Sequence, residues 1–372
     1  MSVAIDTNYL GHANKYIFNH DIMNCTADGV VGNQLYSGRA LGLTQSEDVI
    51  QLHPDLKPLL NDIKSHYQRI GLAHSNDIIW NIDLHQLSSD KTFIPSVFFY
   101  GPHEHQAIKD QKWLAVVDYI NSKNNFMALA RELKVPIPAT QCFNNVNEIK
   151  GETIRFMHYP CYLKAAISVS GVGIYRCTNE GELINAITKF APTVPVQIQE
   201  EVESTNFLNL QYEIVDDEVI QLTASEQILQ GFVHQGNRVP ASHEPWELVD
   251  PMAYWLRDQG MKGIFAFDVA VVNTEHGMRF PAIECNPRYN GASYPTLIAK
   301  KLNIDSWIAL NFSTQHRSLA DIDLTGIEFN PTTGHGVVMV NWGTVLAGKI
   351  MFLIAGTDEQ QRMYGEALKT RL

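Results

Sequence analysis

The chain of 372 residues is poor in cysteine, has no excess of basic residues and lacks a long apolar segment. Its five cysteines are scattered without a CxxC pair, so neither a disulfide framework nor a cysteine-based zinc site is indicated. A reducing, cytoplasmic location fits this usage. The net charge of -12 argues against nucleic acid as the main partner. Because the chain contains neither a signal peptide nor a run of 18 apolar residues, we expect no membrane partner.

What is present predicts a globular protein of two or three lobes, because the chain is long and 45% of its residues are hydrophobic. A helical pattern at 54–70 is followed by candidate buried strands at 77–82 and 94–100, which favours an α/β first domain. From residue 110 the pattern changes to helical spacing over 113–133. We therefore expect a domain boundary near residue 110.

Two segments of this first domain carry residues that could contact a ligand. The stretch 27–42 contains four glycines but no GxGxxG pattern, and an irregular connection is the favoured interpretation. His103 and His105 could share a metal, but no third ligand lies nearby in the sequence. We therefore expect Gly101–His105 to be a loop.

A later segment combines a carboxylate, an amide and a guanidinium at the end of an apolar strand. Side chains alternate along a strand, so Glu284, Asn286 and Arg288 share one face. Residues 263–272 read as a partner strand, with a turn at 273–277, and this register puts Asp268 opposite Glu284. Facing carboxylates repel unless a cation lies between them, and oxygen ligands suit Mg²⁺. The alternative is an edge hairpin with a solvated polar face.

The middle of the chain has features of a phosphate clamp. Lys164 interrupts the apolar strand 161–166, where an unpaired ammonium group would be costly. It precedes a loop of small residues, 167–173, whose backbone N–H groups could bind phosphate oxygens. An ordinary hairpin with a lysine reaching to solvent is the alternative.

In this order, the segments resemble the ATP-grasp superfamily over roughly residues 110–310. The resemblance implies an α/β protein with a pre-ATP-grasp domain at 1–110 and an α+β ATP-grasp domain at 111–372. Within the second domain it implies a small lid at about 140–200 and a metal-binding catalytic lobe at about 203–372.

The resemblance also assigns roles to individual residues. The residues that it implies for ATP binding are Lys123, Lys164, Ser170, Gly171, Gly173, Gln199, Glu200, Val202 and Asn206. Asn206 departs from the family, which usually has an acidic residue at this position to hold the ribose hydroxyls. Asp268, Glu284 and Asn286 would hold Mg²⁺, with Mn²⁺ as an alternative, and Arg288 would face the activated carboxylate.

Flanking loops supply candidate substrate contacts. These polar residues are Gln227, His234, Gln235, Arg238, Asn290 and Ser293. The alternative for each of them is a polar side chain of a surface loop that contacts only water, and Ser293 could instead cap the next helix.

The implied activity is an ATP-dependent ligase that activates a carboxylate as an acyl phosphate for attack by an amine or a thiol, with release of ADP and phosphate. The expected partners are small-molecule substrates, and a carrier protein and a second copy of the chain are further candidates. Two alternatives are an ATP-grasp kinase and a nucleotide-binding regulatory protein without turnover.

Overall fold

The computed structural model describes residues 15–26, 31–88, 92–168, 173–204, 206–231 and 233–372. The chain forms two compact units. Unit 1 contains residues 1–109, 236–239 and 291–372, and unit 2 contains residues 110–235 and 240–290. The first change of unit, at 109/110, lies at the boundary expected from the sequence.

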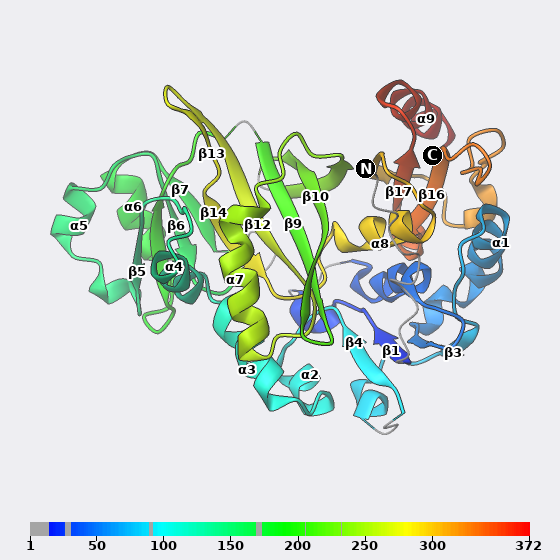
Figure 1. Ribbon diagram of the computed structural model, residues 1–372, viewed down its shortest axis with the longest axis horizontal. Coiled ribbons are helices and arrows are strands. Elements are labelled where there is room, and N and C mark those ends of the chain that lie inside the picture. The colour runs from blue at the N-terminus through cyan, green and yellow to red at the C-terminus, as the bar shows by residue number, and fades with distance from the viewer. Residues whose placement is uncertain (1–14, 27–30, 89–91, 169–172, 205, 232) are drawn as a thin grey trace. The chain divides into compact units, whose positions relative to one another are not determined.

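The first part of unit 1 is an α/β layer. Its sheet has the order β3-β2-β1-β4, and all of its pairings are parallel. Its elements are β1 (Tyr16–Asn19), β2 (Val49–Gln51), α1 (Leu60–Ile70), β3 (Asp77–Ile79), β4 (Ile94–Val97) and α2 (Pro102–Ala107), drawn from blue to cyan in Figure 1. Short 3-10 helices span Met23–Cys25, Asn33–Leu43, Pro54–Leu59 and Leu84–Ser88. The α/β class expected for this region is confirmed.

The last part of the chain completes unit 1. Its elements are α8 (Ser293–Lys301), β15 (Trp307–Ser313), β16 (Gly336–Asn341), β17 (Lys349–Ala355) and α9 (Asp358–Arg371), with 3-10 helices at Leu319–Asp321 and Gly343–Ala347. The three strands pair antiparallel in the order β15-β17-β16. The end of β11 (Val233–Val239) pairs with β15.

Residues 291–372 therefore pack with unit 1, whereas the sequence grouped them with residues 111–290. The physical reason is that α8 and β16 contact the 3-10 helix Asn33–Leu43, and α1 contacts β16. These contacts join segments about 250 or more positions apart, which local sequence patterns do not encode.

Unit 2 contains two antiparallel sheets. The smaller sheet has the order β5-β8-β6-β7, and in the larger one β12 lies between β9 and β14 while β9 also pairs with β10. The strands are β5 (Thr140–Phe143), β6 (Cys161–Ala165), β7 (Ile174–Cys177), β8 (Val196–Glu200), β9 (Asn206–Val215), β10 (Glu218–Gln230), β12 (Gly263–Thr274), β13 (Gly277–Arg279) and β14 (Ala282–Asn286). The range predicted for a lid contains the smaller sheet.

Helices cover both sheets of unit 2 (Figure 1). They are α3 (Gln111–Asn121), α4 (Lys123–Glu132), α5 (Gly151–Arg155), α6 (Glu180–Ile187) and α7 (Trp246–Gln259), and a 3-10 helix spans Val146–Glu148. α7 lies along β9 and β10, and α4 contacts β5, β8 and β14. The core of the larger sheet includes the stacked rings of Tyr212 and Phe265, whose centres are 5.3 Å apart.

Two local predictions were wrong. The helix expected over 113–133 is interrupted at Ser122, whose extended backbone separates α3 from α4 and whose hydroxyl accepts a hydrogen bond from the Asn125 N–H at 3.5 Å. The loop expected at Gly101–His105 is instead the start of α2. Pro102 is accommodated there because the first turn of a helix needs no internal N–H donor, and Glu104 accepts a hydrogen bond from the Gly101 N–H at 3.0 Å.

Within the described ranges, no helix has both the length and the apolar character that a membrane crossing requires.

Candidate functional site

The two facing carboxylates lie on adjacent strands of unit 2. Asp268 of β12 is directly opposite Glu284 of β14, which confirms the predicted register. The next residue of β14, Cys285, is buried in the core, because successive side chains of a strand point to opposite faces. The strand pair therefore presents both acids on one face.

Lys123 contacts Glu284 from the first position of α4, directly after the break between α3 and α4. Its backbone N–H donates to the carbonyl of Ala166 at 2.7 Å, which ties the start of α4 to the end of β6. Its ammonium group is 2.8 Å from Glu284 Oε2, and only 9% of the side chain is exposed. It also donates to Ser168 Oγ at 3.3 Å. A lysine and an acid 161 positions apart thus form one ion pair, in which the lysine is buried and the acid is partly exposed.

Three side-chain amides surround the carboxylate of Asp268. Asn209 and Gln227 donate to Oδ1 at 2.7 and 2.8 Å, and Asn286 donates to Oδ2 at 3.1 Å. Gln227 was predicted as a substrate contact, and in this structure its amide is bound to Asp268. Asn209 was not predicted. Its partner is 59 positions away, and the amide of Asn209 is one of several polar groups in β9, so the sequence did not single it out.

The pKa values of the two acids shift in opposite directions. Burial and the neighbouring Glu284 charge raise the pKa of Asp268, although the Asn209 amide opposes this rise. Burial also raises the pKa of Glu284, but the Lys123 ammonium, Lys164 and Arg288 outweigh it and hold that pKa below its usual value. Glu284 is thus a stable anion, while the charge on Asp268 needs further compensation.

This donor set fits a hard divalent cation. Two carboxylates face each other, their repulsion raises one pKa, and a cation between them would relieve that repulsion. Asn286 would have to rotate its amide to offer oxygen, because its nitrogen now faces Asp268. Across the parts of the chain that the structure describes, no cluster of three or more His, Cys, Asp or Glu side chains could hold a metal ion. The Mg²⁺ site remains a prediction.

The second lysine lies in the smaller sheet. Lys164 of β6 donates to Gln199 Oε1 of β8 at 2.6 Å, and Gln199 in turn donates to Thr140 Oγ1 at 3.0 Å. Burial is the main cause that lowers the pKa of Lys164 to about 8, with Lys123 adding to it and Glu284 opposing it. Lys164 therefore lies close enough to Glu284 and to Lys123 for their charges to change its pKa.

Gln197, which the sequence analysis did not single out, lies directly opposite Lys164 in the register of β6 and β8. It is fully buried, and neither its amide oxygen nor its amide nitrogen has a hydrogen-bond partner among the described residues. A polar residue in the strand 196–200 was the available signal, but its lack of partners is a tertiary property.

The remaining residues predicted for ATP binding have varied surroundings. Glu200 ends β8 and accepts a hydrogen bond from the Ala139 N–H at 2.7 Å, while Asn206 begins β9 and pairs with Val271. Gly173 has the positive φ of 74° that favours glycine. Ser170 and Gly171 lie outside the described residues, and Val202 follows the end of β8.

The predicted substrate residues are divided between the units. Gln227, His234, Gln235 and Asn290 belong to unit 2 together with Arg288, whereas Arg238 and Ser293 belong to unit 1. Arg238 is exposed on β11, and Ser293 is buried at the first position of α8. Arg288 donates to the carbonyl of Tyr289 at 3.0 Å and contributes its charge to both acids. Their roles toward a substrate stay predictions.

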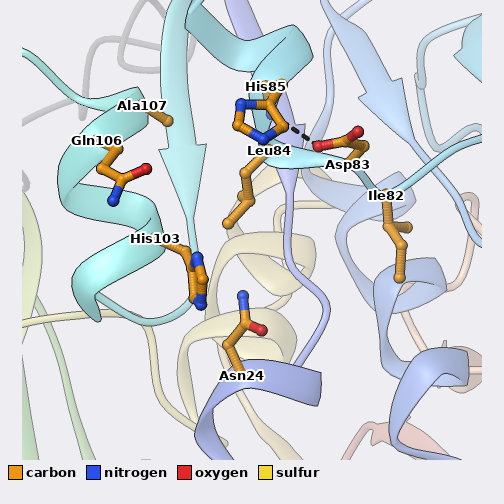
Figure 2. A pocket seen from close by; sticks show the side chains of 8 residues that line it. All are labelled: Asn24, Ile82, Asp83, Leu84, His85, His103, Gln106 and Ala107. Carbon is orange, nitrogen blue, oxygen red and sulfur yellow. Dashed lines mark hydrogen bonds between the residues drawn. The ribbon is translucent and has the colours of Figure 1, made fainter.

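A cavity of about 250 Å³ lies elsewhere, in unit 1 (Figure 2). Its lining consists of Asn24, Ile82, Asp83, Leu84, His85, His103, Gln106 and Ala107. His103, one of the two histidines considered above, therefore faces this cavity from α2. The cavity contains none of the residues that the sequence predicted for nucleotide, metal or substrate.

No known family model matches the chain, but solved structures do. It is similar to N5-carboxyaminoimidazole ribonucleotide synthetase (purK) in complex with ADP, with a TM-score of 0.63 and 14% identity over 95% of each chain. A Staphylococcus aureus N5-carboxyaminoimidazole synthetase complexed with ADP gives 0.60 and 12%, covering 95% of this chain and 97% of that one. Biotin carboxylase from Campylobacter jejuni, in a nucleotide complex, gives 0.62 and 13%, covering 91% and 89%. These proteins share the ATP-grasp architecture, and the present chain has the ATP-grasp fold.

Proposed function

We propose that the chain is an ATP- and Mg²⁺-dependent ligase that converts a carboxylate into an acyl phosphate, which an amine or a thiol then attacks. The products are the joined molecule, ADP and phosphate. The similar solved proteins, which were crystallised with ADP or an ATP form, support nucleotide binding by this fold.

The observation that carries the proposal is the partly buried charge cluster of unit 2. Lys123 pairs with Glu284 at 2.8 Å, Asp268 lies opposite Glu284, and the charge of Lys164 influences Glu284 from the smaller sheet. Two lysines and two acids close together are costly to remove even partly from water for stability alone. The same groups suit a triphosphate and its cation, because they supply both cations for the phosphates and carboxylates for the metal.

The chemistry requires positioning more than covalent participation by the protein. Phosphoryl transfer needs the γ-phosphate and the attacking carboxylate oxygen in line, with the developing charge neutralised. The ammonium groups of Lys123 and Lys164 would bind phosphate oxygens. Mg²⁺, held by Asp268, Glu284 and Asn286, would supply positive charge at the phosphates.

Arg288 is the group best suited to the carboxylate substrate. It lies beyond the metal-binding strand, and its guanidinium can bind a carboxylate or an acyl phosphate through paired hydrogen bonds, which an ammonium group cannot do. The oxygen of the substrate carboxylate attacks the γ-phosphorus, and ADP leaves with the electrons of the broken P–O bond. The amine or thiol then attacks the acyl carbon, and phosphate leaves.

Trapping with hydroxylamine tests this proposal. The protein would be incubated with Mg²⁺, ATP and pools of amino acids and other small carboxylates, with and without hydroxylamine, and ADP, AMP and hydroxamate would be measured. We expect ADP together with a hydroxamate in at least one pool, because hydroxylamine intercepts acyl phosphates.

Other products would contradict the ligase. ADP with a stable phosphorylated product would identify a kinase, and AMP would exclude an acyl phosphate made by γ-phosphoryl transfer. Binding of ATP without any product across the pools would instead favour the regulatory protein.

A further inference from the structure

Arg39 is a buried arginine of unit 1 whose surroundings are almost entirely aromatic. It lies in the 3-10 helix Asn33–Leu43, and only 7% of the residue is exposed. Its guanidinium carbon is 4.1 Å from the ring centre of Phe98, 4.3 Å from that of Tyr294 and 5.1 Å from that of Tyr36. The rings stabilise the positive charge through cation–π contact, but they accept few of its N–H donors.

Two of those donors form an unused fork. Nε and Nη2 of Arg39 are both buried, and neither has a hydrogen-bond partner among the described residues. These two nitrogens lie on the same edge of a guanidinium group, where their N–H bonds point in parallel toward one planar oxyanion.

The same edge is occupied at two other arginines of this chain. Arg69 donates from Nε and Nη2 to the two oxygens of Glu328 at 2.8 and 2.7 Å. Arg176 does the same with Glu201 at 2.6 and 2.7 Å. Arg39 therefore has the geometry of a bidentate pair in which the acid is missing.

Neighbouring groups leave the charge of Arg39 only partly compensated. His20 is held by Tyr294 Oη at 2.8 Å and Ser96 Oγ at 3.0 Å, and burial together with Arg39 lowers its pKa, so it stays neutral. Asp21 is close enough for Arg39 to lower its pKa, although burial dominates and raises that pKa. No carboxylate within the described ranges forms an ion pair with Arg39.

Burying a guanidinium edge without acceptors lowers the stability of the folded protein, and a fold rarely retains such a group without a use. Tyr36 and Phe98 are each partly exposed, so the aromatic cluster reaches the surface of unit 1. A small molecule can therefore approach the rings from solvent.

We propose that Arg39, with Tyr36, Phe98 and Tyr294 around it, forms a binding site for an oxyanion with two adjacent oxygens, either a carboxylate or a phosphate group. The anion accepts hydrogen bonds from Nε and Nη2, and the rings exclude water from the pair. This site belongs to unit 1 and shares no residue with the charge cluster of Lys123 and Glu284. It would bind its anion whether or not unit 2 binds a nucleotide.

Titration with two probes tests the site. Sodium phosphate and sodium acetate would be added separately to the intact protein at constant ionic strength, with sodium chloride as the balancing salt. The ¹⁵Nε–¹Hε signal of Arg39, assigned by its loss in Arg39→Met, would be followed. We expect a saturable downfield shift with at least one probe. A response to phosphate alone would identify a phosphate site, and one to acetate alone a carboxylate site.

Variants give a second readout through binding measured by calorimetry. Arg39→Met removes the fork and keeps an apolar side chain between the rings, so binding of the active probe should weaken at least tenfold. Arg69→Met is the matched control, because its fork is already occupied by Glu328, and it should bind the probe as the wild type does. Phosphate could also bind to the residues of unit 2 that are proposed to hold the nucleotide. Lys164→Met, which lacks one of these residues, shows how much of the measured phosphate binding belongs to unit 2.

Urea unfolding tests whether the charge of Arg39 is uncompensated when no anion is bound. Without added anion, Arg39→Met should unfold at the same or a higher urea concentration than the wild type, because an uncompensated buried charge is removed. The proposal is overturned if neither probe shifts the Arg39 signal, or if Arg39→Met binds the active probe unchanged. Should that variant not fold, Arg39→Lys, which keeps the positive charge but lacks the Nε–Hε group, assigns the signal, and the titration of the wild type then decides between these outcomes.

Discussion

The two glutamines of β8 lie on one face of the strand, two positions apart, yet their surroundings differ. Gln199 accepts a hydrogen bond from Lys164 and donates one to Thr140. Gln197 is fully buried, and neither of its amide atoms finds a partner among the described residues. An unpaired buried amide lowers stability by about 1–3 kcal/mol.

This contrast predicts opposite effects of one substitution. Gln197→Leu should leave the free energy of unfolding unchanged or raise it, because it removes an unsatisfied amide at nearly constant volume. Gln199→Leu should lower it by roughly 2 kcal/mol, because Lys164 loses its acceptor in a buried site. Urea unfolding of the two variants measures both effects.

If Gln197 instead serves the nucleotide, the shift of the melting temperature by MgATP should be smaller in Gln197→Leu than in the wild type. Strong destabilisation by Gln197→Leu would show that its amide is satisfied in the folded protein.

At the same scale, the sequence predicted residues whose relation is local. Strand alternation and one hairpin register were enough to pair Asp268 with Glu284. The bonds of Asn209 and Gln227 to Asp268 were not predicted in this way, because they depend on the order β12-β9-β10 in the sheet. The contact of Lys123 with Glu284 was not predicted, because the family resemblance assigned Lys123 to the nucleotide phosphates and Glu284 to the metal.

Among the elements, those with clear periodicity were predicted within a few residues. The break at Ser122 was not, because the apolar spacing continues through it and only the bond from the Lys123 N–H to Ala166 reveals why the helix ends. The helix at Pro102–Ala107 was missed for the opposite reason. It is too short to show periodicity, and its proline and histidines resemble a loop.

Helix α9 offers a test of an element whose start is encoded locally. Thr357 accepts a hydrogen bond from the Gln360 N–H at 3.3 Å, and the Gln360 side chain accepts one from the Thr357 N–H at 2.9 Å. Thr357→Ala breaks this capping box and should lower the free energy of unfolding by about 1 kcal/mol.

Thr357→Ser is the control for that helix, because it keeps the hydroxyl acceptor and should change stability much less. Equal unfolding curves for the alanine variant and the wild type would contradict a stabilising cap.

At the scale of the whole molecule, the assignment of the last segment of the chain to a unit was the hardest property to predict. The sequence placed 111–372 in one domain, but 291–372 return to unit 1. Glu328 illustrates the cause. It binds His66 at 2.6 Å and Arg69 through both oxygens, joining the last part of the chain to α1 across about 260 positions. Nothing local to residue 328 indicates either partner.

This connection predicts a dependence of stability on pH. Burial alone would raise the pKa of Glu328, but hydrogen bonds from His66 and Arg69 lower it to about 2 from its usual 4.5. Because the folded pKa is depressed, the stabilisation is fully present above pH 4.5 and is lost as the pH falls toward 2. The free energy of unfolding at pH 7 should therefore be about 2 kcal/mol lower for Glu328→Gln than for the wild type.

Below pH 4.5 the difference between Glu328→Gln and the wild type should shrink, which urea unfolding at several pH values would measure. Glu366→Gln serves as the control, because Glu366 is an exposed partner of Lys369 and should contribute less than about 1 kcal/mol. A constant difference across the pH range would contradict the role given to the Glu328 charge.

The binding of MgATP to the intact protein, measured by calorimetry, tests the central claim that the charge cluster of unit 2 holds a nucleotide and its cation. The wild type should bind one MgATP, and Glu284→Gln should bind it at least tenfold more weakly while still folding, because the amide oxygen can still accept from Lys123. Glu218→Gln, which changes an exposed acid of the same unit, should bind as the wild type does. Absence of MgATP binding by the wild type, or unchanged binding by Glu284→Gln, would contradict the account.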